Sequence, residues 1–159
     1  MIKITLITLG KLKEKYLRDA TDEYAKRLSR YCKLEIVELT PINLPEKPSQ
    51  SEIDSALLKE YEMIEKRIPE GSVVTTLCVE GKSMSSECLA GFVDSKINEG
   101  KNMCFIIGSS YGLSDKIKQK SDLRLSVSAM TFPHQLFRVM LLEQIYRAFK
   151  INEGGTYHK

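Results

Sequence analysis

The fold is decided by Met103-Cys-Phe-Ile-Ile107 and the turn that follows it, Gly108-Ser-Ser-Tyr-Gly112. A short, uninterrupted apolar run that ends at a glycine is typical of a strand buried on both faces of a parallel sheet. In open α/β sheets, ligands bind where such strands end. We therefore expect an α/β protein with a ligand site close to Gly108.

Similar apolar runs recur along the chain and alternate with stretches of helical period. Strands are predicted at Ile2–Thr8, Leu34–Leu39, Ser72–Val79, Met103–Ile107 and Leu123–Val127. Helices are predicted at about Lys15–Tyr31, Glu52–Ile68, Ser86–Ile97, Ser114–Lys120 and Pro133–Asn152. This alternation predicts a sheet with much parallel pairing. No linker or repeat interrupts it, so residues 1–159 are expected to form a single domain.

Local signals mark two helix starts and one unusual cation. Ser49 and Glu52 have the spacing of a capping box, and Pro133 suits a first helical position. Arg138 lies on the apolar side of the last helix, so it needs a partner there. Leu136 and Met140 lie on the polar side of that helix. We therefore expect this helix to be covered on more than one face, either by a second subunit or by other parts of its own chain.

Composition excludes several classes of protein. The chain has 159 residues, of which 42% are hydrophobic and 28% charged, which excludes a disordered or fibrous chain. Its uncharged stretches are too short to span a bilayer, and no signal peptide is recognisable. The four cysteines form no CxxC pair and there are two histidines, so no metal site is expected. These features predict a cytoplasmic protein with reduced thiols and no membrane partner.

The net charge of +3 conceals two segments of opposite sign. Residues 1–33 carry nine basic and four acidic groups, whereas residues 34–70 carry four basic and nine acidic groups. A basic N-terminal segment could contact nucleic acid phosphates, and a solvated helix face would explain it equally well.

Two glycine motifs suggest other activities. Gly81-Lys82-Ser83 imitates the end of a P-loop, but Thr76 stands where that motif requires a glycine, so the P-loop fails. Gly108-Ser-Ser-Tyr-Gly112 matches the G-x-S-x-G nucleophile elbow. Because Asp115 or Asp122, and then His134, follow Ser110 in the order of an α/β-hydrolase triad, a serine hydrolase that uses Ser110 remains an alternative.

Three strand ends predict one shared pocket. Leu77-Cys-Val79, Ile107-Gly108 and Val127–Phe132 each pass from an apolar strand into small or polar residues. Together they offer backbone groups beside apolar walls with few charges. Such a pocket suits a neutral planar group such as adenine better than a polyphosphate.

Four longer strings carry a resemblance to a known family. They are Gly108–Gly112, Ser126-Val-Ser-Ala-Met-Thr-Phe-Pro-His-Gln135, Glu143-Gln-Ile-Tyr-Arg-Ala-Phe-Lys150 and the ending Tyr157-His158-Lys159. The chain resembles, essentially end to end, the RlmH family of SPOUT-class rRNA methyltransferases. One position differs, because the family's usual Gly-Gly is Gly108-Ser109 here, which reduces the backbone freedom of this loop.

The resemblance implies a specific activity and architecture. It implies S-adenosyl-L-methionine-dependent methylation of N3 of a pseudouridine in helix 69 of 23S rRNA (the pseudouridine 1915 site), on the assembled 70S ribosome. It also implies a homodimer, a SPOUT-type sheet and a C-terminal trefoil knot. The residues that match the family's cofactor contacts are Leu77, Gly108, Val127, Ser128, Ala129, Met130, Thr131 and Phe132.

Methyl transfer to N3 requires that the imide proton leaves before or during attack, which calls for a base or a stabilising cation. The candidates are His158 as base or proton relay, Tyr157 as base or orienting hydroxyl, and Arg147 as stabiliser of the anion or phosphate clamp. A structural role is favoured for His134. A ribosome-binding factor without turnover is a further alternative to the enzyme.

Overall fold

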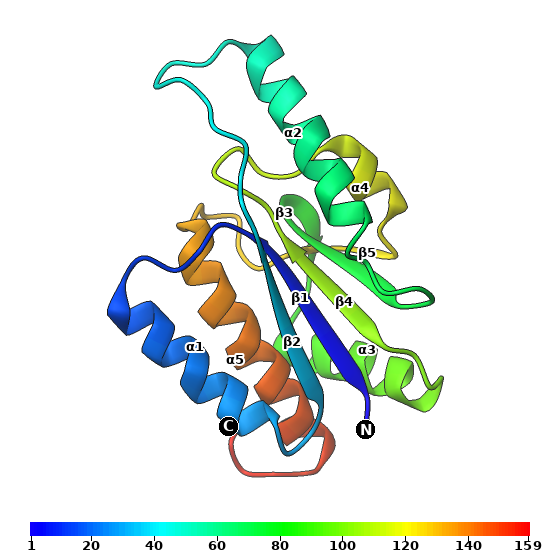
Figure 1. Ribbon diagram of the computed structural model, residues 1–159. Helices are drawn as coiled ribbons and strands as arrows, with labels where there is room; N and C mark the ends of the chain where they lie inside the picture. Colours follow the sequence, from blue (N-terminus) through cyan, green and yellow to red (C-terminus); the bar gives the residue numbers. More distant parts are fainter.

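Five parallel strands form the centre of the molecule, with helices on both faces (Figure 1). The computed structural model describes residues 1–159. The strands are β1 (Lys3–Leu9), β2 (Lys33–Leu39), β3 (Val73–Ser83), β4 (Met103–Ile107) and β5 (Leu123–Ser126). The helices are α1 (Lys15–Leu28), α2 (Gln50–Glu65), α3 (Ser86–Asn98), α4 (Asp115–Lys120) and α5 (His134–Asn152). The strand order is β2-β1-β4-β3-β5 and every pairing is parallel, which confirms the predicted α/β class.

The central strand β4 is buried on both faces, as its unbroken apolar run predicts. Met103, Phe105 and Ile107 pack into the larger core cluster, to which α1, α3 and α5 contribute. Cys104 and Ile106 pack into the smaller cluster, to which α2 and α4 contribute. The alternation of side chains along a strand thus produces two cores, one on each side of the sheet.

The main departure from the predicted elements is the length of β3. This strand continues to Ser83, because it pairs with β5 twice, with a break in register between Leu77 and Lys82. Gly81 lies against the β5 backbone, where an added Cβ would be 2.8 Å from the carbonyl carbon of Arg124. The Gly81-Lys82-Ser83 string therefore serves strand pairing, in agreement with the rejection of a P-loop.

The predicted helix starts are confirmed to within two residues. The Ser49 hydroxyl accepts from the Glu52 amide at 3.2 Å, and the Glu52 carboxylate accepts from the Ser49 amide at 3.1 Å, which completes the capping box. Pro133 is the N-cap of α5 rather than its first helical residue, since its ψ of 133° is extended. None of the helices combines the length and apolar character needed to cross a membrane.

Arg138 joins the start of α5 to the sheet. Its side chain is 5% exposed and donates to the Glu38 carboxylate at 2.7 Å, to the Thr8 hydroxyl at 2.9 Å and to the Gly10 carbonyl at 3.0 Å. The three acceptors lie at the C-terminal ends of β1 and β2. This arrangement confirms the expectation that Arg138 finds a partner on the apolar side of the helix.

Replacement of Arg138 by methionine should destabilise the fold, because it leaves the Thr8 hydroxyl and the Gly10 carbonyl without their donor. Removal of one partner of a buried pair costs about 3–5 kcal/mol, and because Glu38 can still reach water we expect about 2–3 kcal/mol here. Urea unfolding of Arg138→Met would measure this loss. Lys15→Met, which breaks the exposed ion pair with Asp19, is the matched control and should change little. Equal stability of the two variants would contradict the role given to Arg138.

Candidate active site

A cavity of about 680 Å³ opens where β4 ends, beside the stretch of β3 at which its register with β5 breaks. The loop after β5 and the start of α5 complete its wall. This is the edge of a parallel sheet at which α/β proteins bind ligands, and it unites the three segments singled out in the sequence, although Leu77–Val79 lies within β3 and not at its end. The lining residues are Leu77–Glu80, Ile107–Leu113, Lys118, Val127, Ser128, Thr131–His134 and Phe137.

Six of the eight predicted cofactor residues line this cavity, namely Leu77, Gly108, Val127, Ser128, Thr131 and Phe132. The other two, Ala129 and Met130, belong to the same loop but do not line it. The Met130 amide donates to the Ser128 hydroxyl at 3.0 Å, and this turn leaves Met130 73% exposed. The structure thus gathers the loop as expected but directs its tip away from the cavity.

The Gly108 turn has no room for a side chain. A Cβ at Gly108 would lie 2.3 Å from the Gly112 carbonyl oxygen, and the Gly112 amide closes the turn on the Ser109 carbonyl at 2.9 Å. Gly112 itself has a φ of 84°, in the left-handed region that glycine tolerates best. The two glycines are therefore required for the shape of this wall.

Few charged groups face the cavity. Glu80 and Lys118 form an ion pair, whose hydrogen bond lowers the pKa of the Glu80 carboxyl. Burial, assisted by the positive charges of Arg138 and Lys13, lowers the pKa of His134, so its ring is neutral at neutral pH. The remaining wall is made of apolar side chains, small hydroxyls and backbone.

The serine hydrolase alternative loses its support in this geometry. Ser110 and His134 line the same cavity, but no hydrogen bond joins their side chains. The Asp122 carboxylate accepts instead from the Val74 amide at 2.8 Å. A nucleophile needs a base within hydrogen-bond reach and a third group that orients this base. The triad is not assembled.

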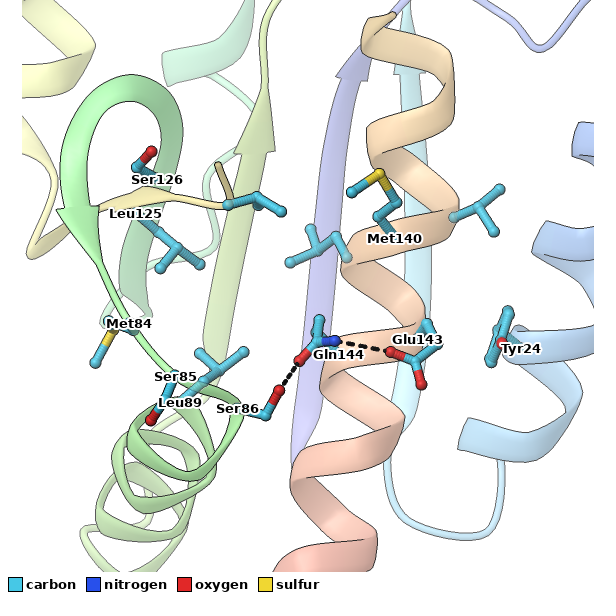
Figure 2. A pocket seen from close by; sticks show the side chains of 13 residues that line it. Tyr24, Met84, Ser85, Ser86, Leu89, Leu125, Ser126, Met140, Glu143 and Gln144 are labelled. Atoms are coloured by element: carbon cyan, nitrogen blue, oxygen red, sulfur yellow. Dashed lines mark hydrogen bonds between the residues drawn. The ribbon is translucent and has the colours of Figure 1, made fainter. Parts of the chain in front are cut away.

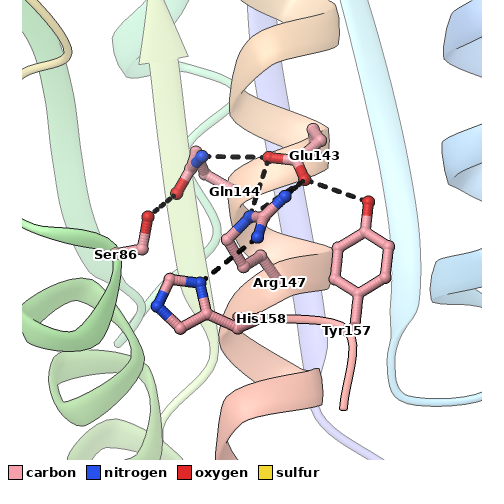
Figure 3. A network of polar contacts seen from close by, with 6 residues as sticks. All are labelled: Ser86, Glu143, Gln144, Arg147, Tyr157 and His158. Carbon is pink, nitrogen blue, oxygen red and sulfur yellow. Dashed lines mark hydrogen bonds and ion pairs between the residues drawn. The ribbon is translucent and has the colours of Figure 1, made fainter. Parts of the chain in front are cut away.

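A second polar centre lies near the C-terminal end of α5, around the Glu143 carboxylate (Figure 3). Arg147 donates to Glu143 through Nη2 at 2.6 Å and through Nε at 3.1 Å. The Tyr157 hydroxyl donates to the same oxygen at 3.1 Å, and the Arg147 guanidinium lies 4.7 Å from the centre of the Tyr157 ring. His158 Nδ1 lies 3.2 Å from Arg147 Nη1. The structure therefore brings the three predicted catalytic residues together.

The hydrogen bonds in this centre define the protonation of its members. Since a guanidinium only donates, Nδ1 of His158 accepts from Arg147, and Nε2 carries the proton that it donates to Glu87 at 2.7 Å. Burial, followed by the hydrogen bond to Glu143, raises the pKa of the Tyr157 phenol to about 12. At neutral pH Tyr157 is a hydrogen-bond donor and not a base.

A smaller cavity of about 360 Å³ adjoins this centre, with Glu143 and Gln144 in its wall (Figure 2). The Gln144 amide accepts from the Ser86 hydroxyl at 2.7 Å and donates to Glu143 at 2.9 Å. The rest of the wall is largely apolar and includes Met84 and Met140. A row of hydrogen-bonded polar side chains thus crosses the wall of this cavity from α3 to α5.

The two sites lie at different heights along α5. His134, which lines the larger cavity, begins the helix, and Arg147 follows on the same helix. Phe137 is the last residue of α5 that lines this cavity, so at 1.5 Å of rise per residue Arg147 lies about 15 Å further along the axis. Within one chain, Arg147 is therefore far from the larger cavity.

Some basic side chains of the N-terminal segment, residues 1–33, already make contacts within the chain. Arg18 donates to the carbonyls of Leu12 and Lys13, and Lys15 pairs with Asp19. Lys11 and Lys13 form no ion pair and lie in the segment between β1 and α1.

Sequence reasoning missed several residues of both centres. The spacing of Glu143 and Arg147, four residues apart on a helix, is a signal that would have found the first of them. Glu87 and Lys118 gave no signal, because they reach their sites from other elements of the fold.

Comparison with known proteins agrees with this fold. Residues 2–158 match the family described as "Predicted SPOUT methyltransferase". Ribosomal RNA large subunit methyltransferase H of Clostridium botulinum (strain Alaska E43 / Type E3) is 53% identical over 161 residues, covering 99% of this chain and all of the relative. Putative ribosomal RNA large subunit methyltransferase H of Methanococcus maripaludis (strain C5 / ATCC BAA-1333) is 52% identical over 159 residues, covering 99% of this chain and all of the relative.

Solved structures share the fold at low sequence identity. A probable methylase family protein from Haemophilus influenzae Rd KW20 superposes with a TM-score of 0.55 at 12% identity, over 96% of this chain and 66% of the other. A structure described as "Structural insights into the 2-OH methylation of C/U34 on tRNA" gives 0.52 at 10% identity, over 96% and 97% of the two chains. The end-to-end family match, supported by relatives about half identical, establishes that this chain belongs to the SPOUT methyltransferases, in the family of ribosomal RNA large subunit methyltransferase H.

Proposed function

We propose that this protein uses S-adenosyl-L-methionine to methylate N3 of a pseudouridine in helix 69 of 23S rRNA on the assembled ribosome. The observation that carries the proposal is the gathering of six expected cofactor positions around one cavity. The printed names of the relatives, which are large-subunit rRNA methyltransferases, support the substrate class. Cytoplasmic action follows from a ribosomal substrate.

The larger cavity fits this cofactor in size and chemistry. Its volume of about 680 Å³ lies within the roughly 300–1,000 Å³ usual for small-molecule sites. Leu77, Leu113 and Phe132 offer apolar walls for adenine, and the Ser128 and Thr131 hydroxyls offer polar contacts. When bound, the cofactor supplies a sulfonium methyl group that a nucleophilic nitrogen takes by in-line displacement.

The Glu143 centre supplies what the target imide needs. Arg147 presents a permanent cation that can stabilise the N3 anion. Glu143 orients this cation by accepting hydrogen bonds from two of its N–H groups. Tyr157 acts as an orienting hydroxyl. His158 becomes a proton acceptor when Arg147 turns from Nδ1 to the substrate.

A homodimer would bring the two centres together. Arg147 lies about 15 Å along α5 from the cavity of its own chain, so a second copy is the natural source of the missing groups. Leu136, Val139 and Met140 on α5 are only half-buried within the chain and offer apolar surface for such a contact. The trefoil knot stays a prediction that belongs with this proposal.

RNA binding would use the basic N-terminal segment together with the shape of the ribosome. Near the start of α1, Lys11 and Lys13 are the basic residues whose side chains form neither an ion pair nor a hydrogen bond within the chain. Contacts of this kind go to phosphates and weaken as salt rises.

The proposal is tested by methyl transfer. The purified protein, incubated with tritiated S-adenosyl-L-methionine and ribosomes that lack the modification, should label 23S rRNA, and mass spectrometry should place the methyl group on N3 of a helix 69 pseudouridine. Naked 23S rRNA is the control for the need for an assembled ribosome. Cofactor binding in calorimetry without any transfer would instead indicate a binding factor.

Tyr157→Phe tests the role of the phenol. Because its pKa of about 12 lies above the working range, the phenol keeps its proton at neutral pH. We expect a loss of about tenfold in kcat, as one orienting hydrogen bond of about 1.4 kcal/mol is removed, with the shape of the pH–rate profile between pH 6 and 9 unchanged. Disappearance of a basic limb from that profile would show that Tyr157 is the base.

Mixed dimers test the composite site. Gly108→Ala should block the cofactor turn and Arg147→Ala should remove the cation, so each homodimer should be inactive. In a dimer of one copy of each, one of the two sites combines an intact cavity with an intact Arg147. Co-expression at equal levels should therefore restore about a quarter of the wild-type activity, since half the dimers are mixed and each has one good site. No restoration would mean that both groups act within one chain.

A further inference from the structure

Glu60 on α2 is the only acidic residue that the fold buries, with 4% of its surface exposed. It has no lysine, arginine or histidine partner among the ion pairs. Its Oε1 accepts from the Ser109 hydroxyl at 3.0 Å and its Oε2 accepts from the Ile42 amide at 3.0 Å. A buried carboxyl group without a cation depends on such donors, so both bonds are needed.

The two donors lie in the loops after β2 and β4, two strands that β1 separates in the sheet. Ile42 follows β2 in the proline-rich segment, and Ser109 follows β4 in the wall of the larger cavity. Glu60 is therefore a fixed point in the smaller core, next to Tyr61 and Ile64 of the same helix. The hydrogen bond from Ser109 connects Glu60 to the Gly108–Gly112 turn.

Ser109 is also the position at which this chain carries a serine where a glycine is usual in the family that it resembles. A glycine would leave the turn free to sample other conformations, at an entropic cost when a ligand orders it. The Ser109 hydroxyl offsets this cost, because its bond to Glu60 orders the turn before the ligand arrives.

We infer that Glu60 and Ser109 form a tether that holds the cofactor-binding turn in its binding conformation. Both are positioning residues: Glu60 acts on the cofactor through Ser109, and Ser109 acts through the backbone of Gly108–Gly112. The inference rests on the proposed use of S-adenosyl-L-methionine in this cavity. It assigns to α2, which lies outside the cavity wall, a part in cofactor affinity.

The test measures the dissociation constant of S-adenosyl-L-methionine by calorimetry on the purified full chain. Ser109→Ala should weaken binding about tenfold, which corresponds to about 1.4 kcal/mol. Ser109→Thr restores the hydroxyl and should return the constant to near the wild-type value. Ser72→Ala is the matched control, because this half-buried serine also loses a hydrogen bond, to the Pro69 carbonyl, far from the cavity.

Glu60 variants test whether Ser109 acts through Glu60. Glu60→Gln keeps an acceptor for the Ile42 amide and a donor for the Ser109 oxygen, and should bind the cofactor nearly as well as the wild type. Glu60→Ala should weaken binding as Ser109→Ala does, and the double variant should be no weaker than Glu60→Ala alone. Additive losses would overturn the tether.

Kinetics separate positioning from a structural role. With ribosomes as substrate, Ser109→Ala should raise the KM for the cofactor about tenfold and leave kcat within about twofold, as uniform binding is lost. A fall in melting temperature with an unchanged dissociation constant would show that Ser109 serves stability only. Failure of the wild type itself to bind the cofactor would reject the proposed function. A Ser109→Ala variant with the same dissociation constant as a wild type that does bind would reject the tether alone.

Discussion

The parallel pairing of β4 with β1 on one side and β3 on the other is the constraint on which the rest of the structure depends. Its side chains are buried in both cores, so the strand can exist only where helices cover both faces. The turn after β4 and the stretch of β3 at which its register with β5 breaks then meet at one edge of the sheet. The larger cavity is a direct result of this geometry.

The helix α5 carries the second constraint. Arg138, near its start, is held by acceptors at the ends of β1 and β2, which fixes the helix beside the cavity edge. Further along, Glu143 and Arg147 gather the C-terminal residues Tyr157 and His158. One helix thus joins the ligand edge to a distant polar centre, and its length keeps the two apart in a single chain.

The elements themselves were predictable because their causes are local. The strand β4 has the predicted bounds, and the capping box at Ser49 starts α2 through hydrogen bonds within four residues. The end of β3 was not predictable, because it continues to Ser83 only where β5 offers a second pairing. Ala129 and Met130 were expected in the cavity from their place in a string, whereas the turn closed on Ser128 directs them away.

The sequence by itself determined the α/β class, the end of β4 at the ligand edge and the family, because these depend on periodicity, on glycine and on strings of adjacent residues. Only the tertiary structure decided that Arg147, Tyr157 and His158 share the Glu143 carboxylate, that Ser110 and His134 do not form a triad, and that Glu60 is buried beneath Ser109. The physical reason is distance along the chain. A hydrogen bond between residues such as Glu60 and Ser109 exists only after the sheet has brought two loops together, and no local pattern records which loops will meet.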